Sequence, residues 1–263
     1  MPNRRATSPI FHMRLSQLPK ELLARTVVEP MLATGHVPRQ ECLRRVIHWT
    51  LANRDLRFPT DHPLKVIEDI PEWDNTFALS RSSLLWLWAR LVRLRPSAIL
   101  ELGSGRTTFA LATFAREQEA TGGSAPKIVT VEAEGEWLDR TRAILERHDL
   151  HSFVDFSHAP ALLTPDLHGY DLTKASLEPL FAQYPADFVL IDGPSGGQGR
   201  FGTLPSVYHL LSETAEIFLD DCGRPQEQET LRSWARKYDG ELHCQGIVPT
   251  VGGLGWLSRN PQL

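Results

Sequence analysis

Residues 98–108, AILELGSGRTT, determine the fold that we expect for this chain. The first five residues are apolar except for Glu101, which predicts a buried strand. Gly103 and Gly105 follow and allow the backbone to turn tightly, and residues 107–119 have the apolar spacing of a helix. A buried strand that leads into a helix through glycines predicts a sheet with helices packed on it.

The rest of the chain repeats this alternation of short apolar runs and helical stretches. The other predicted strands are residues 128–131, 153–156, 188–191 and 217–219. The other predicted helices are residues 136–148, 177–183, 205–212 and 227–238. Residues 242–248 and 255–258 flank a turn signal at 250–253 with no helix between them. The expected fold class is therefore α/β: a doubly wound, mostly parallel, Rossmann-like sheet of seven strands with an antiparallel C-terminal hairpin.

The N-terminal part of the chain has a different pattern. Helix-spaced apolar residues predict two or three short helices there: Leu15, Leu18, Leu22, Leu23, Cys42, Val46, Ile47 and Leu51. Pro59, Pro63 and Pro71 then predict a linker, and Ser80 is the expected N-cap of a helix that Pro96 ends. We expect an N-terminal helical extension over residues 1–75, acting as a lid or a homodimer contact, and an α/β domain over residues 76–263.

Composition excludes several classes of protein. The chain has 263 residues, with 28 Lys and Arg against 32 Asp and Glu, a formal charge of -4 and no run of five or more like charges. A nucleic-acid partner is therefore not expected. Three scattered cysteines predict no disulfide framework, and the sequence has neither an 18-residue apolar stretch nor a secretory signal pattern. We expect a cytoplasmic protein without a membrane partner.

The first two predicted strands end in residues that suit a nucleotide-like cofactor. Gly103 and Gly105 let the backbone approach a ligand at the start of a helix, and Glu132 is placed to accept hydrogen bonds from ribose hydroxyls. A dinucleotide fingerprint would have a third glycine at Thr108 and an acid about 20 residues after the glycines. Glu132 lies 27 residues after Gly105. These departures argue against a nicotinamide cofactor but leave it as an alternative.

The next two predicted strands end in acids. Asp192 ends the fourth strand, and Asp220 and Asp221 follow the fifth, 28 and 29 residues later. Neighbouring strand ends would bring three carboxylates together, and Mg²⁺ is the usual cation that neutralises such a group. A metal there would lower the pKa of a substrate hydroxyl. The alternative is that Asp221 only caps a turn or the following helix.

Taken in order, five segments of residues 80–258 resemble class I S-adenosylmethionine-dependent methyltransferases, especially small-molecule O-methyltransferases of the catechol and macrocin type. The segments are ILELGSGRTT, VTVEAEGEWL, FSHAPA, ADFVLIDGPSG and IFLDDCGRPQEQETLRSW. The resemblance implies cofactor contacts from these segments: Glu101, Gly103, Ser104, Gly105, Thr107, Thr108, Glu132, Ala133, Ala159 and Asp192. It also implies S-adenosylmethionine as the cofactor of residues 76–263, and Asp192, Asp220 and Asp221 as ligands of a metal such as Mg²⁺.

The implied reaction is methyl transfer to a hydroxyl of a small molecule, such as a sugar or a secondary metabolite. Metal-dependent relatives carry a base where this chain has Pro194 and Ser195. Either the base comes from elsewhere, the metal alone suffices, or the metal has been lost and the site works differently. If the base comes from elsewhere, a histidine is the candidate. The candidates on loops near the expected cleft are His158, His168 and His209. We take His209 together with Asp192 as the catalytic pair. A nicotinamide-dependent oxidoreductase and a non-catalytic cofactor-binding protein remain the alternatives.

The loop at residues 193–202 is rich in glycine and suits a mobile loop on the substrate side. Arg200 in this loop would hold an anionic or polyhydroxylated substrate, or pair with one of the acids. Arg224 and Glu227 are expected to form an ion pair that fixes the turn after Asp221.

Overall fold

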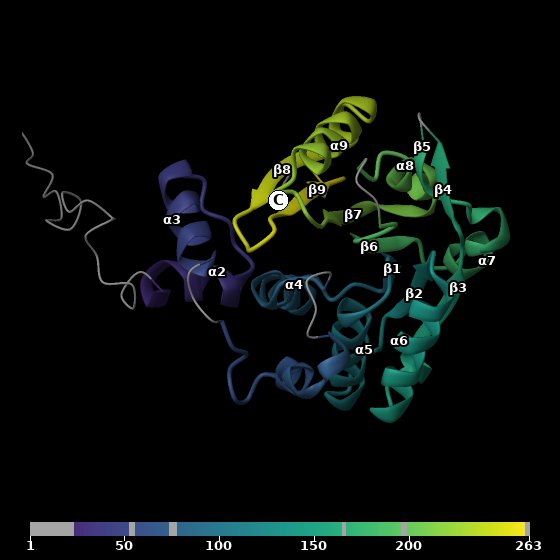
Figure 1. The fold of residues 1–263 in the computed structure, drawn as a ribbon, viewed down its shortest axis with the longest axis horizontal. Helices are drawn as coiled ribbons and strands as arrows, with labels where there is room; N and C mark the ends of the chain where they lie inside the picture. Colours follow the sequence, from purple (N-terminus) through teal and green to yellow (C-terminus); the bar gives the residue numbers. More distant parts are fainter. Residues whose placement is uncertain (1–23, 53–55, 74–77, 165–166, 196–198, 261–263) are drawn as a thin grey trace, which may run out of the picture.

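The structure is a computed structural model that describes residues 24–52, 56–73, 78–164, 167–195 and 199–260. A twisted sheet crosses the molecule, with helices on both of its faces (Figure 1). The main sheet has seven strands in the order β3-β2-β1-β6-β7-β9-β8. Their bounds are β1 Ala98–Leu102, β2 Lys127–Glu132, β3 Val154–His158, β6 Ala186–Ile191, β7 Leu211–Leu219, β8 His243–Val248 and β9 Leu254–Ser258.

The pairing of these strands confirms the predicted fold class. Five neighbouring strands are parallel to one another: β3, β2, β1, β6 and β7. β9 pairs antiparallel with both β7 and β8. The C-terminal hairpin therefore closes one edge of the sheet, as the turn signal at residues 250–253 predicted. The last strand of the chain lies inside the sheet, and β8 forms the edge.

Two apolar layers cover the faces of the sheet. On one face, Ile99 of β1 and Phe188 of β6 pack against the longer helices α4–α6. On the other face, Leu100 and Val189 pack with residues of α7–α9. The helix bounds are α4 Arg81–Leu94, α5 Arg106–Ala120, α6 Gly135–Arg147, α7 Leu177–Phe181, α8 Thr203–Val207 and α9 Pro225–Lys237. Alternate residues of each strand thus enter opposite layers, which explains why the strands read as continuous apolar runs.

Helix α4 begins where the sequence predicted. The Ser80 side chain accepts a hydrogen bond from the Ser83 backbone N–H at 3.1 Å and caps the helix. The helix ends one residue before its expected stop, because Arg95 already has the left-handed conformation that closes a helix.

Two parts of the prediction are wrong. An antiparallel hairpin, β4 Ala161–Thr164 and β5 Leu167–Tyr170, follows β3 and was not expected. The helix predicted over residues 205–212 ends early, since β7 already begins at Leu211. The polar residues at the start of β7, Ser212 to Thr214, lie partly or fully exposed before the buried part of the strand, so no apolar run marks this beginning.

The N-terminal helices pack on the same core as the sheet. Met31 of α2 (Glu29–Thr34) and Ile47 of α3 (Glu41–Ala52) are buried with residues of α4. The proline-rich segment forms two short 3-10 helices, Pro63–Asp69 and Pro71–Trp73. The expected boundary at residues 75 and 76 and the predicted apolar positions from Leu15 to Leu23 lie outside the described residues. The domain division and the lid or homodimer roles of residues 1–75 stay predictions.

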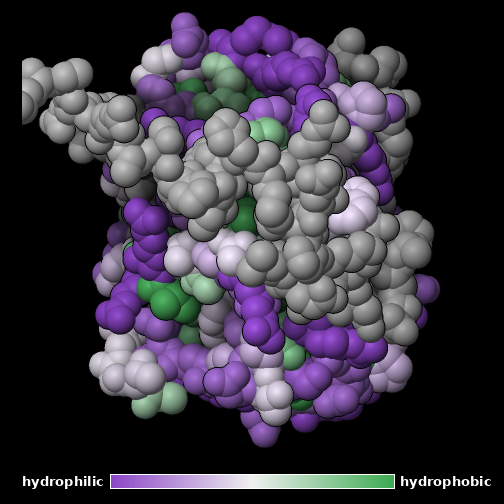
Figure 2. All heavy atoms as spheres, turned by 90° about the vertical axis from the view of Figure 1, so that its left-hand side faces the viewer, coloured by the Kyte–Doolittle hydropathy of each residue, from purple (hydrophilic) through white to green (hydrophobic). Residues whose placement is uncertain are grey.

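Seen from the side of α2 and α3, the described residues present a mainly hydrophilic surface with hydrophobic side chains in small separate areas (Figure 2). Among the described helices, none combines the length and the apolar composition needed to cross a bilayer.

Candidate functional site

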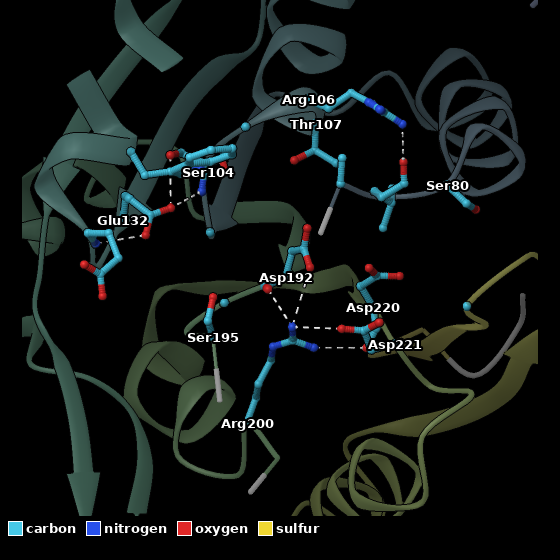
Figure 3. A pocket seen from close by; sticks show the side chains of 18 of the residues that line it. Ser80, Ser104, Arg106, Thr107, Glu132, Asp192, Ser195, Arg200, Asp220 and Asp221 are labelled. Carbon is cyan, nitrogen blue, oxygen red and sulfur yellow. Dashed lines mark hydrogen bonds and ion pairs between the residues drawn. The ribbon is translucent and has the colours of Figure 1, made fainter. Parts of the chain in front are cut away.

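A cavity of about 700 Å³ lies at the carboxyl ends of the central strands. Its lining comes from the segments that follow β1, β2, β6 and β7, together with the residues just before α4 and the β8–β9 turn (Figure 3). Open α/β sheets bind ligands at this edge. We therefore take the cavity as the candidate site.

The turn after β1 depends on two glycines. Gly103 and Gly105 have φ angles of 108° and 149°, a region that side chains other than glycine rarely adopt. A Cβ atom on Gly103 would lie 2.7 Å from the Gly193 nitrogen, so a larger residue does not fit between the ends of β1 and β6. Gly103, Ser104, Gly105 and Thr107 line the cavity, and their contact with a cofactor stays a prediction.

Glu101 and Thr108 lie behind this turn rather than in the cavity. Thr108 Oγ1 accepts from the Gly105 N–H at 2.9 Å and donates to Glu101 Oε2 at 2.6 Å, while Thr130 donates to the same oxygen at 2.7 Å. Both side chains are fully buried. Glu101 and Thr108 support the turn, and their direct contact with a cofactor stays a prediction.

Burial also changes the acidity of Glu101. Loss of hydration raises the pKa of the Glu101 carboxyl to about 7, although the hydroxyls of Thr107, Thr108 and Thr130 lower it. The nearby Glu132 carboxylate adds to the increase.

Glu132 stands at the end of β2 and lines the cavity. Its Oε2 atom accepts from the Ser104 backbone N–H at 2.7 Å and from the Ser104 hydroxyl at 3.0 Å. Its Oε1 atom accepts from the backbone N–H groups of Ala133 at 2.7 Å and Glu134 at 3.0 Å. The carboxylate is thus fixed by four donors of the chain and ties the turn after β1 to the end of β2.

The two predicted alanine contacts are not part of the cavity lining. Ala159 is fully buried and donates its N–H to the Glu132 carbonyl at 2.9 Å. Ala133 is half-buried and does not line the cavity either. The residues after β2 that line the cavity are Glu134 and Trp137, and the contact of Ala133 and Ala159 with a cofactor stays a prediction.

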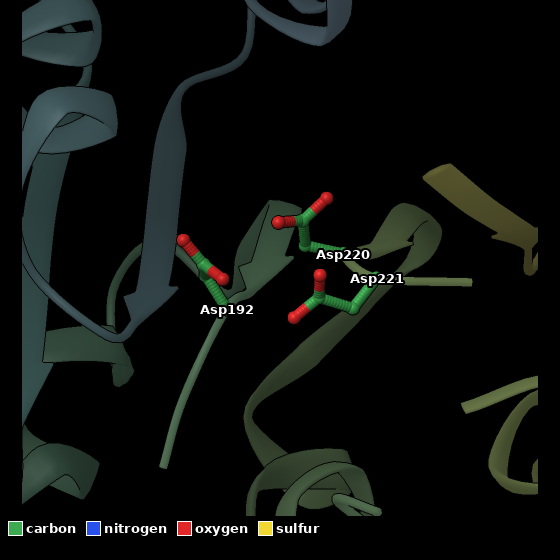
Figure 4. Close-up of side chains that lie close together, drawn as sticks. All are labelled: Asp192, Asp220 and Asp221. Atoms are coloured by element: carbon green, nitrogen blue, oxygen red, sulfur yellow. The ribbon is translucent and has the colours of Figure 1, made fainter. Parts of the chain in front are cut away.

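The three acids at the strand ends lie close together, as the sequence predicted. We call Asp192, Asp220 and Asp221 the acid trio. One carboxylate oxygen of each lies within 4.8 Å of the others, and the three side chains converge from the ends of β6 and β7 (Figure 4). The pairing of these strands explains the placement, since the Asp192 N–H bonds to Leu102 O at 2.8 Å and the Asp220 N–H bonds to Ile191 O at 3.0 Å.

The turn after β7 fixes Asp221. This residue has a φ angle of 62°, so the backbone turns sharply at the second acid. The next two N–H groups, of Cys222 and Gly223, bond to Gly253 O at 2.9 Å and Gly252 O at 2.6 Å. The β8–β9 turn therefore holds the loop that carries the acids.

Arg200 reaches the acid trio from the loop after β6. Its Nη2 atom donates to Asp192 O at 2.7 Å and lies 3.6 Å from Asp192 Oδ1 and 3.2 Å from Asp221 Oδ2 (Figure 3). Its Nη1 atom donates to Asp220 O at 3.2 Å and pairs with Glu227 Oε1 at 3.4 Å. Of the two roles expected for Arg200, the structure shows pairing with the acids.

The expected ion pair between Arg224 and Glu227 is wrong. Arg224 instead pairs with Asp221 at 3.0 Å from the solvent side, and Glu227 faces the buried guanidinium of Arg200. Helix α9 begins at Pro225, which points Glu227 in its first turn toward the protein interior, where it is 2% exposed.

Burial and mutual repulsion raise the pKa values of Asp192 and Asp220. Burial raises the pKa of Asp192 to about 7; Arg200 lowers it, and Asp221 raises it further. Burial and the charges of Asp192 and Asp221 hold the pKa of Asp220 well above its usual value. Arg200 alone therefore does not compensate the charge of the trio.

A divalent cation fits this group of donors. Carboxylate oxygens are the ligands that Mg²⁺ prefers, and the three oxygens lie close enough to converge on one ion. The trio and Glu227 place four carboxyl groups beside the two arginines Arg200 and Arg224. A cation bound there would favour the ionised form of these acids.

None of the three candidate histidines lines the cavity. His209 is 57% exposed and pairs with Glu178 at 3.5 Å, and its place on the short 3-10 helix before β7 directs it to the surface. His158 is exposed and contacts Ala133 O at 3.0 Å, while His168 is buried against Gly199 O. The structure therefore places His209 outside the cavity, and its catalytic role stays a prediction without support from the geometry.

Several residues that line the cavity were not predicted from the sequence. Trp137 of α6 donates its indole N–H to Ser104 O at 2.7 Å and so supports the glycine turn. Ser80, Arg106 and Val251 also line the cavity. Ser80 was recognised only as a helix cap, and nothing in the local pattern places Val251 beside the strand ends.

Solved structures of other proteins have a similar fold. An O-methyltransferase from Bacillus cereus in complex with SAH is 18% identical, with 78% of this chain and 93% of that chain covered and a TM-score of 0.54. The chain has the methyltransferase fold. The SAH-bound methyltransferase PaMTH1 of Podospora anserina is 16% identical, with 84% and 97% covered and a TM-score of 0.54.

A methyltransferase from Geobacter sulfurreducens is 17% identical, with 77% of this chain and 93% of that chain covered and a TM-score of 0.52. No protein-family model and no curated protein matches the chain. At these identities the likeness establishes the methyltransferase fold, and the activity has to be argued from the site.

Proposed function

We propose that this protein is an S-adenosylmethionine-dependent methyltransferase that transfers a methyl group to a hydroxyl of a small molecule. The observation that carries the proposal is one cavity in which the glycine turn after β1, the Glu132 carboxylate and the acid trio meet. Two proteins with the same fold, from Bacillus cereus and Podospora anserina, have SAH bound.

Each side of the cavity has chemistry that suits one part of this reaction. The backbone of Gly103 to Gly105 lines the cavity without a Cβ atom at either glycine, which allows the close approach of the methionine portion of the cofactor, and Glu132 accepts hydrogen bonds from its ribose. The acid trio lies across the cavity from Glu132 (Figure 3), where an acceptor hydroxyl would meet the sulfonium methyl group. Holding the two reactants in line supplies much of the rate of such a displacement.

The acid trio supplies the cation site of the proposal. Asp192 lines the cavity at the end of β6, where an acceptor hydroxyl would lie beside the trio. Asp192, Asp220 and Asp221 would hold Mg²⁺, which when bound lowers the pKa of a hydroxyl next to it. The carboxylates and the buried Arg200 keep this part of the cavity polar, which suits an acceptor with several hydroxyl groups.

Methyl transfer from S-adenosylmethionine labelled in its methyl group tests the proposal. The acceptors are a panel of sugars, phenols and aliphatic alcohols, with Mg²⁺ or with EDTA. We expect labelled product from at least one acceptor, loss of the product with Asp192→Asn, and normal activity with the matched control Asp139→Asn, whose side chain is exposed on α6.

The alternatives give different results in the same assay. A nicotinamide-dependent oxidoreductase would be stabilised against heat by NAD and not by S-adenosylhomocysteine. A non-catalytic protein would bind S-adenosylhomocysteine and methylate no member of the panel. Either result contradicts the proposed function.

A further inference from the structure

Arg200 is a buried cation beside the cavity that contacts several segments of the chain. Its side chain is 6% exposed, and it contacts the ends of two strands and the start of a helix. The guanidinium donates to the carbonyl groups of Asp192 and Asp220, at 2.7 and 3.2 Å, so it joins the end of β6 to the end of β7. The Glu227 carboxylate anchors it from α9 at 3.4 Å. An arginine held in this way has little freedom to leave.

The same guanidinium contacts two carboxylates of the acid trio. Nη2 lies 3.2 Å from Asp221 Oδ2 and 3.6 Å from Asp192 Oδ1, whereas no ion pair joins Arg200 to the Asp220 carboxylate (Figure 3). We propose that Arg200 is the resident cation of the acid trio: it positions Asp192 and Asp221 and lowers the affinity of the trio for a divalent cation.

The physical reason is competition for the same oxygens. A divalent cation bound by the trio would lie near a fixed positive charge, and this repulsion is only weakly screened at a buried site. Arg200 also bridges the carboxylates of Asp192 and Asp221 and offsets their mutual repulsion, which preserves the geometry of the site. The trio would then be assembled without a metal and would bind one reversibly.

Arg224 provides a matched comparison on the other side of the trio. It pairs with the same Asp221 oxygen at 3.0 Å, but its side chain is 59% exposed. Solvent and salt screen an exposed charge, so Arg224 should affect cation binding much less than Arg200. The two arginines differ in burial while sharing a partner, which separates the effect of a buried charge from that of charge alone.

Binding of Mn²⁺, followed by the loss of the electron paramagnetic resonance signal of the free ion, tests the proposal. The proteins are the wild type, Arg200→Met, Arg224→Met and the double variant Arg200→Met with Glu227→Gln. The double variant removes one positive and one negative charge, so it keeps the net charge and leaves no unpaired Glu227 in the interior. Circular dichroism establishes that each variant is folded.

We expect weak binding of Mn²⁺ to the wild type and binding at least about tenfold tighter to both Arg200 variants, because a charge about 4 Å from the ligand oxygens is removed. For Arg224→Met we expect a change of less than about threefold. An unchanged or weaker affinity in the double variant would overturn the proposal, as would the absence of Mn²⁺ binding in all four proteins.

The inference rests on the proposed function, because it takes the acid trio as the cation site of that reaction. Titration of the same samples with S-adenosylhomocysteine keeps the two separate. If S-adenosylhomocysteine binds and the Mn²⁺ results are contrary, only the role of Arg200 fails. If S-adenosylhomocysteine does not bind, the cofactor assignment fails whatever the Mn²⁺ result.

Discussion

Ser104 donates two hydrogen bonds to Glu132 Oε2, one from its backbone N–H at 2.7 Å and one from its hydroxyl at 3.0 Å. The other oxygen, Oε1, accepts from the N–H groups of Ala133 and Glu134. A carboxylate has about four lone-pair sites, so the chain itself uses all of them. A ribose hydroxyl can bind Glu132 only if one of these donors leaves, and the Ser104 hydroxyl is the donor that can rotate away.

Ser104→Ala should therefore strengthen cofactor binding. The variant leaves one site of Glu132 free for the ribose while it keeps the backbone donor. We expect the dissociation constant of S-adenosylhomocysteine to fall about fivefold, which corresponds to about 1 kcal/mol for one hydrogen bond that no longer has to be broken. Isothermal titration measures this change. A weaker affinity would mean that the hydroxyl itself contacts the cofactor.

Glu132→Ala should have the opposite effect. It removes the carboxylate that accepts from the ribose and also releases the turn after β1, so we expect the affinity for S-adenosylhomocysteine to fall by a factor of about ten or more. Glu134→Ala is the control, because Glu134 lines the same cavity with an exposed side chain. Equal affinities of the two variants would remove Glu132 from the site.

Glu101→Gln should change how stability depends on pH. Burial raises the pKa of Glu101 from 4.5 to about 7, so between these values the folded state binds more protons than the unfolded state. The free energy of unfolding of the wild type therefore falls as the pH rises through this window. The glutamine side chain does not ionise and can still accept from Thr108 and Thr130.

The measurement is urea unfolding of Glu101→Gln and the wild type at about pH 5 and about pH 8. From the lower to the higher pH, the difference in unfolding free energy between the two proteins should shift by up to about 3 kcal/mol in favour of the variant. Glu134→Gln serves as the exposed control and should show no such shift. A difference that does not depend on pH would contradict the assigned ionisation of Glu101.

Arg90→Met should destabilise the fold strongly. Arg90 and Glu216 form an ion pair in which the side chains are 1% and 0% exposed, and the guanidinium lies 4.6 Å from the centre of the Trp256 ring. Removing the arginine leaves a buried carboxylate without its partner, which costs about 3–5 kcal/mol.

Addition of Glu216→Gln to Arg90→Met should restore much of the lost stability, since both buried charges are then absent. Urea denaturation of the single and double variants gives the comparison. If the single variant unfolds at the same urea concentration as the wild type, the ion pair does not contribute to stability in the way we describe.

The sequence allowed the central part of the site to be predicted because strand ends in a parallel sheet meet at one edge. The apolar runs that end at Leu102, Val131 and Ile191 fixed the positions of the glycine turn, Glu132 and Asp192. Asp220 and Asp221 follow the next apolar run, so they were expected beside Asp192, and the structure places them together. The positions of these residues follow from where the apolar runs end.

The contacts made by loops could not be predicted in this way. Arg200 and Glu227 approach the acids through a glycine-rich loop and a helix start, whose directions depend on tertiary packing. His209 was expected near the cavity without a geometric reason, whereas it lies exposed on the 3-10 helix before β7. The β4–β5 hairpin was missed because its strands are only four residues long.

Isothermal titration of the wild-type protein with S-adenosylhomocysteine, and separately with NAD, tests the central claim most directly. We predict that one molecule of S-adenosylhomocysteine binds per chain, with or without EDTA, and that NAD gives no binding heat. Binding of NAD without binding of S-adenosylhomocysteine would contradict the assignment of the cavity to a methyl donor.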